Sequence, residues 1–196
     1  MVSADEFGRS LRGTTGLANR RAEALDLFGT DRPALLRALS AIGLTLPALV
    51  VALALERRAL GLPVAGFGRL FDDALLVAAV ATGHVAAFLV PLGAILWVVR
   101  GTPTARRFVP WAVVTTWISV CGSFGLALPG ALYLMNLESA EFTAALTFAF
   151  TAIVLQAQFF ATRLTLGVGT SVAGGIVLLG ILADLALGSL VRSLAG

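Results

Sequence analysis

The chain has 196 residues, of which 58% are hydrophobic and 13% charged, and its mean hydropathy is +0.94. A soluble domain carries roughly 25% charged residues, so this chain has about half the usual supply. This composition excludes a soluble globular domain, a nucleic-acid-binding protein and a secreted disulfide scaffold. The single cysteine, Cys121, has no partner for an intrachain disulfide.

The polar N-terminal segment, residues 1–33, contains ten charges and no apolar run of signal-peptide length. We therefore expect a cytoplasmic segment without a cleavable signal, followed by a first span that acts as an uncleaved anchor. Its apolar side chains repeat at a helical period between residues 16 and 28, which predicts a short amphipathic helix at the lipid headgroups. A helix exposed to water is the alternative. The repeating residues are Leu17, Ala24, Leu25 and Phe28.

Five uncharged stretches follow, and each is about as long as a bilayer-spanning helix needs to be. They predict an all-α, polytopic integral membrane protein whose transmembrane domain covers residues 34–196. The predicted spans are about 34–55, 74–99, 108–135, 142–162 and 167–191.

Several residues mark the ends and irregularities of these spans. Pro47 lies in the middle of the first span and is expected to kink it. Arg37 lies about one turn inside that span, where its long side chain is expected to reach the surface. Helix caps are expected at Asp31, at Asp72-Asp73 and at Ser139.

The arginines predict the orientation, because cytoplasmic loops carry an excess of Lys and Arg. The chain has 14 arginines and no lysine, and an N-in, C-out topology places ten of them inside. The high Ala, Gly, Leu and Arg content is typical of a GC-rich bacterial genome, so we expect a bacterial inner membrane. The four arginines left outside are Arg57, Arg58, Arg69 and Arg192.

His84 and Asp184 are the ionisable side chains deepest in the spans, and such groups are candidates for function. In the predicted topology they lie about 15 and 10 Å from the outer ends of their helices, so they are able to meet. One hypothesis is a His–Asp pair in a polar cavity that binds or relays a proton or small cation. The alternative is a neutral histidine bonded to a carbonyl, with Asp184 near an interface.

Gln156 and Gln158 extend this candidate polar site to the fourth span. With hydroxyls on the third span they predict either a polar path or ordinary hydrogen bonds between helices. The hydroxyl residues are Thr115, Thr116, Ser119 and Ser123.

Small residues recur at helical spacing and predict close helix packing, within the chain or in a homo-oligomer. One stripe is Gly167, Ser171 and Gly175, and another is Ala79, Gly83 and Ala87.

No catalytic, cofactor or metal site is expected. Ser123 lies between glycines, as in some intramembrane proteases, but the only histidine lies upstream on an earlier span. The glycines from Gly167 to Gly175 imitate a dinucleotide fingerprint without the preceding strand. One His, one Cys and a lone intramembrane Asp do not make a metal site.

Two patches resemble small bacterial membrane proteins whose topology is that of the Yip family. They are residues 106–111 (RRFVPW), continuing through Trp117 to Pro129, and residues 158–168 (QFFATRLTLGV). The resemblance in topology covers about residues 17–196 and implies five spans and an exported C-terminus. The acidic and Gly-Pro signature of eukaryotic members is missing, so no trafficking role and no functional residue is carried over.

Two functions follow as hypotheses. The first is a non-enzymatic, Yip-like membrane protein that organises or supports membrane partners, with the lipid bilayer, other membrane proteins or further copies as its partners. The second is a small transporter or channel subunit that uses the polar site around His84 and Asp184.

Overall fold

The computed structural model describes residues 2–62, 64 and 68–195, and these residues form helices and connecting loops without a strand. Five helical stretches are long and apolar enough to cross a membrane, which confirms the predicted number of long apolar helices and the all-helical fold. The stretches are Arg32–Ala59, Ala74–Val99, Pro103–Leu134, Ala140–Leu166 and Thr170–Leu190.

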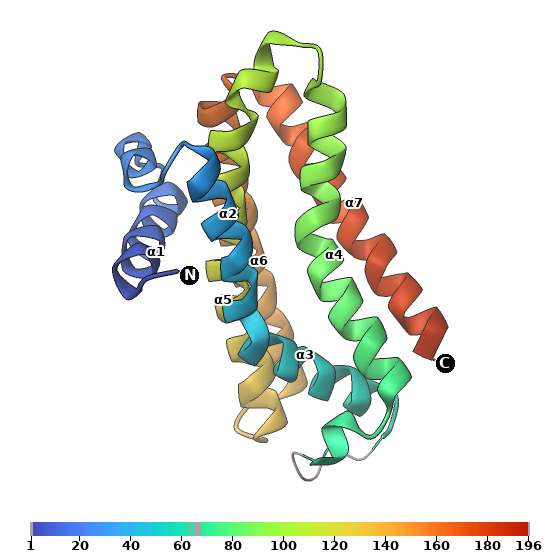
Figure 1. Ribbon diagram of the computed structural model, residues 1–196. Coiled ribbons are helices and arrows are strands. Elements are labelled where there is room, and N and C mark those ends of the chain that lie inside the picture. Colours follow the sequence, from blue (N-terminus) through green and yellow to red (C-terminus); the bar gives the residue numbers. More distant parts are fainter. Residues whose placement is uncertain (1, 63, 65–67, 196) are drawn as a thin grey trace.

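The spans assemble as two helix pairs joined by the first span (Figure 1). Helices α5 (Phe108–Leu134) and α6 (Ala140–Leu166) form one pair, and α4 (Ala74–Val99) and α7 (Thr170–Ala195) form the other. Helix α5 is the most enclosed, because every side chain from Trp111 to Ile118 is buried. The short 3-10 helices η3 (Gly68–Phe71) and η4 (Pro103–Arg107) lie in the loops on either side of α4.

The first span is discontinuous, as the mid-span proline predicted. It consists of α2 (Arg32–Ser40), the 3-10 segment η2 (Ala41–Thr45) and α3 (Leu46–Ala59). Pro47 lies in the first turn of α3, a position where its missing N–H leaves no helical hydrogen bond unmade. The span therefore restarts at the proline and changes direction there.

The three predicted helix caps are present. Asp31 accepts a hydrogen bond from Ala34 N at 2.8 Å, and Asp73 accepts one from Leu76 N at 3.0 Å. Ser139 Oγ accepts one from Phe142 N at 3.2 Å. Each cap satisfies one of the free amides at a helix start, so these polar residues set where the spans begin.

The N-terminal segment differs from the single helix predicted over residues 16–28. Helix α1 (Ala4–Ala18) ends before a turn with Arg20 at φ 59°, and the 3-10 helix η1 (Ala22–Leu27) then folds back on it. Gly16 permits this turn, since a Cβ there would lie 2.5 Å from the Cβ of Ala24. The apolar residues named from the sequence do share one core, but they reach it from two short helices instead of one.

Helix α1 packs against α5 and α6 and is tied to the first span by an ion pair. Arg37 Nε lies 3.0 Å from Glu6 Oε1, so Arg37 binds a carboxylate of α1, where a side chain reaching the surface alone was expected. Phe7 of α1 adds a ring contact to Trp117 of α5, with centroids 6.3 Å apart. The segment is therefore part of the packed structure.

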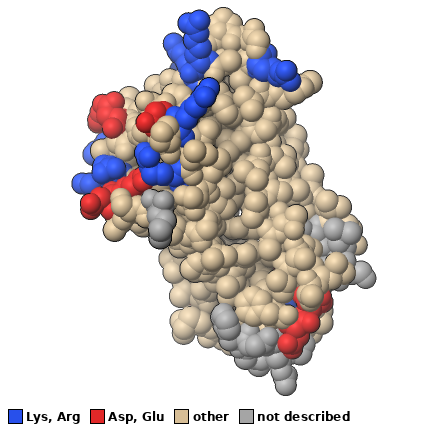
Figure 2. Space-filling view, viewed as in Figure 1, with Lys and Arg blue, Asp and Glu red and all other residues tan. Residues whose placement is uncertain are grey.

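Charged side chains gather at one end of the bundle and over the N-terminal segment (Figure 2). At the end that carries η4, Arg107 donates to the carbonyl of Leu166 at the close of α6. At the opposite end, Arg58 lies over the ring of Tyr133 at 4.2 Å and donates to its carbonyl. This contact gives Arg58 a structural role at the end of the bundle where the predicted topology places few arginines. The side chains of Arg69 and Arg192 lie outside the described residues.

Candidate functional site

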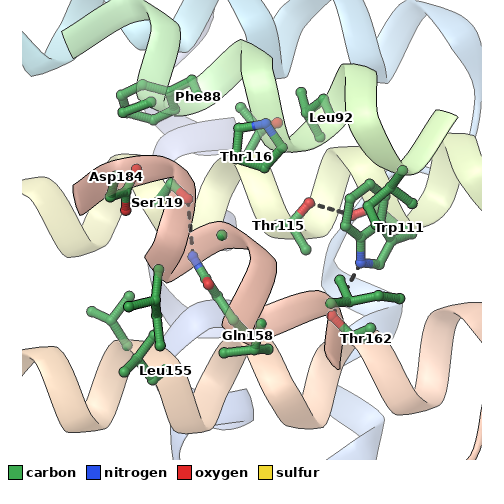
Figure 3. Close-up of a pocket in the computed structure, with 18 of the residues that line it drawn as sticks. Phe88, Leu92, Trp111, Thr115, Thr116, Ser119, Leu155, Gln158, Thr162 and Asp184 are labelled. Atoms are coloured by element: carbon green, nitrogen blue, oxygen red, sulfur yellow. Dashed lines mark hydrogen bonds between the residues drawn. The ribbon is translucent and has the colours of Figure 1, made fainter. Parts of the chain in front are cut away.

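Helices α4, α5, α6 and α7 enclose a cavity of about 160 Å³ within the predicted spans (Figure 3). A cavity needs only about 10–15 Å³ to hold a water, so this one has room for a small solute. Most of its lining is apolar, but polar side chains from three helices converge on it. The polar lining residues besides Trp111 are Thr115, Thr116, Ser119, Thr151, Gln158, Thr162 and Asp184.

Hydrogen bonds across α5 and α6 hold one wall of this cavity in place. Trp111 Nε1 donates to Thr162 Oγ1 at 3.1 Å, and Gln158 Nε2 donates to Ser119 Oγ at 3.2 Å. Thr115 Oγ1 donates to the carbonyl of Trp111, one turn earlier, at 2.8 Å. Figure 3 shows these bonds as dashed lines along the two helices. The wall is therefore fixed without using the carboxylate of α7.

Thr116 differs from its neighbours because its hydroxyl is buried without a partner. The residue is 3% exposed, lines the cavity, and its Oγ1 has no hydrogen-bond partner among the described residues. Leaving a buried polar group unpaired costs about 1–3 kcal/mol. The oxygen itself has less than 1 Å² of accessible surface, so a molecule in the cavity would reach it only after the wall shifts.

Asp184 lies on the boundary between this cavity and a second hollow of about 210 Å³. The second hollow also contains His84 of α4 and Glu56 of α3, so Asp184 is the polar side chain common to both spaces. Its side chain is exposed on the described structure. The carboxylate is therefore accessible from either hollow.

His84 faces the break in the first span. Its Nε2 lies 2.7 Å from Thr45 Oγ1, and that hydroxyl is 2.6 Å from the carbonyl of Ile42. Because the Thr45 hydroxyl donates its proton to the Ile42 carbonyl, the His84 imidazole donates to Thr45 through Nε2. No hydrogen bond or ion pair joins His84 to Asp184 among the described residues, although both line the second hollow.

Gln156 does not belong to this site, contrary to the sequence-based prediction. Its Nε2 donates to the carbonyl of Ala18 at 2.7 Å, and its Oε1 accepts from Arg20 at 3.4 Å. Residues two apart on a helix face different sides, so Gln156 and Gln158 diverge. Gln158 lines the cavity while Gln156 fastens the end of α1.

Replacing Gln156 with alanine is expected to expose the N-terminal segment to trypsin. The change removes two hydrogen bonds, each with a net value of about 0.5–1.5 kcal/mol, so we expect about fivefold to 150-fold faster cleavage after Arg20. Gln158→Ala is the matched control, because Gln158 donates its hydrogen bond to Ser119 of α5, whereas Gln156 donates to Ala18 of the segment. Equal cleavage rates in the two variants would contradict the role of Gln156.

Of the predicted packing stripe of Gly167, Ser171 and Gly175, only Gly167 packs within the chain, against the side chain of Arg107. Gly167 ends α6 with φ 65°, while Ser171 and Gly175 are exposed, and a Cβ on Gly175 would meet no atom within 4 Å. Close packing occurs instead on α5, where a Cβ on Gly122 would lie 2.9 Å from Val154. The stripe on α4 does face its neighbour, since Ala79 and Gly83 line a hollow along α7.

The sequence missed several residues of the cavity. Phe88, Trp111 and Thr162 line it, although none had been singled out for the site. Thr115, Thr116 and Ser119 were named and do line it, whereas Ser123 donates to the carbonyl of Ser119 and is not among the lining residues. The spacing could have identified Thr162, because it lies one turn after Gln158 on the same face of the helix.

Comparisons with known proteins assign no function to this chain, so a functional proposal has to rest on the cavity. No protein-family model, curated protein or solved structure matches this chain. Among the described residues, no three His, Cys, Asp or Glu side chains gather closely enough to hold a metal ion.

Proposed function

We propose that the protein is a small membrane transporter or transporter subunit whose solute site is the cavity between α4, α5, α6 and α7. The observation that carries this proposal is the convergence of polar groups from three helices on one hollow within the spans. Polar groups in an apolar layer raise the free energy unless they are paired. A passing solute accounts for the accessible Asp184 carboxylate.

We also propose the bacterial inner membrane with the N-terminus inside. The support is the cluster of arginines at the end of the bundle formed by η4 and the close of α6, which suits a cytoplasmic face (Figure 2). The Arg58 contact with Tyr133 removes one of the objections to this orientation.

Solute-driven swelling of proteoliposomes tests the transport proposal. The probes are glycerol, urea, sodium chloride and ethylammonium chloride, with light scattering as the readout. Gly180→Leu is expected to reduce any flux at least tenfold, because Gly180 lines the cavity and a Cβ there would meet no atom within 4 Å. Gly93→Leu is the matched control, since Gly93 is exposed on α4 and also has open space beside it.

Either of two results would contradict the transport proposal. Proteoliposomes that swell no faster than empty liposomes with every probe would exclude transport of these solutes. A flux that Gly180→Leu leaves unchanged would exclude the cavity as its route.

A second candidate is the Yip-like organiser of membrane partners. It is favoured by the small, exposed face of α7 at Ser171 and Gly175, which no other part of the described chain covers. Small residues let transmembrane helices approach closely, so this face suits another helix. Crosslinking in native membranes distinguishes the candidates: an organiser loses its crosslinked partner on Gly175→Leu, whereas a monomeric transporter is unaffected.

A further inference from the structure

We infer that the solute of this cavity is a small organic monocation of the ammonium type. This inference rests on the proposed transport function and names its substrate class. The first argument is charge: Asp184 is the one ionisable side chain among the residues that line the cavity. No cationic side chain lines it, so the cavity selects against anions and favours a single positive charge.

The hydrogen-bonding groups agree with this choice. Three donors of the wall are already used, since Trp111 donates to Thr162, Gln158 to Ser119, and Thr115 to a backbone carbonyl. These bonds leave the second amide atom, Gln158 Oε1, and the Asp184 carboxylate as acceptors. Acceptors suit a solute that carries N–H groups or a diffuse positive charge.

Size and aromatic lining favour an organic ion over an alkali metal ion. The cavity of about 160 Å³ is far larger than a bare metal ion, and most of its lining is apolar. Phe88 and Trp111 line it, and aromatic faces attract ammonium cations. An ion with a few methyl or methylene groups fills the apolar part while its charge reaches Asp184.

The position of Asp184 explains how such an ion would enter. Its carboxylate borders the second hollow, where Glu56 and His84 also lie. An unpaired carboxylate deep in an apolar layer raises the free energy of the protein. A bound cation offsets that cost, so the ion and the carboxylate stabilise each other.

Ligand-induced stabilisation of the purified protein in detergent tests the inference. The probes are choline and its uncharged isostere 3,3-dimethylbutan-1-ol, with sodium chloride matching ionic strength. At about ten times its Kd, choline is expected to raise Tm by about 3–6 °C, and the isostere by less than a third of that. Asp184→Asn is expected to abolish the difference between the two probes, and Asp73→Asn, which removes a carboxylate outside the cavity, to preserve it.

The outcomes separate this inference from the transport proposal. Equal shifts with choline and its isostere overturn the cation assignment, while loss of both shifts in Gly180→Leu would keep the cavity as a binding site. No shift with choline in the wild-type protein also overturns the inference, whatever the swelling assay gives. The wild-type comparison needs no variant, so it holds even if Asp184→Asn fails to fold.

Discussion

Replacing Trp117 with alanine is expected to lower the Tm of the protein in mild detergent by about 6–12 °C. Trp117 is 1% exposed in the core shared by α1, α2, α5 and α6, and it contacts Phe7. Deleting a buried tryptophan costs about 3–5 kcal/mol in soluble cores. We take about 3 kcal/mol, because lipid or detergent is itself apolar and the free energy of transferring the side chain is therefore smaller. Each kcal/mol corresponds to about 2–4 °C in Tm.

Trp97→Ala is the matched control for this prediction. Trp97 is 72% exposed on α4, so the same deletion leaves no internal cavity. We expect its Tm to lie within about 2 °C of the wild type. Circular dichroism during heating gives both values, and an equal loss in the two variants would contradict the packing of α1 on α5.

Replacing Gly122 with leucine is expected to disrupt the α5–α6 pair. A Cβ at this position would already lie 2.9 Å from Val154 Cγ2, and the β-branched valine has few alternative rotamers. Overpacking of this kind costs about 1–3 kcal/mol. Taking about 2 kcal/mol, we expect a Tm loss of about 4–8 °C.

The same substitution on α7 separates packing within the chain from packing between chains. Gly175→Leu places its side chain in open space and is expected to leave the Tm of the monomer unchanged. Size-exclusion chromatography with light scattering then reports whether this face holds a second copy. A Tm loss at Gly175 equal to that at Gly122 would contradict the arrangement of α7 described above.

The spans were predictable because their signal is local. Long uncharged runs define the five helices, and Asp31, Asp73 and Ser139 cap them where short polar side chains precede an apolar run. Pro47 lies where α3 begins, since a proline, which lacks an N–H, fits the first turn of a helix. These properties belong to a residue and its neighbours in sequence.

The site was only partly predictable, since it depends on which helix faces which. Asp184 and Gln158 were named from the sequence and line one cavity, but His84 bonds to Thr45 and Gln156 turns to the N-terminal segment. The helical period of a sequence shows which residues share a face of one helix, but it does not show which other helix packs against that face.

The scarcity of charge therefore determined the class of protein and the course of its chain through five spans. Only the tertiary structure decided that Arg37 pairs with Glu6, that Gly175 of α7 remains uncovered, and that Asp184 borders two hollows. The physical reason is the uniformity of the apolar spans. Because most apolar side chains pack nearly as well against lipid as against each other, helix pairing is set by a few small and polar residues.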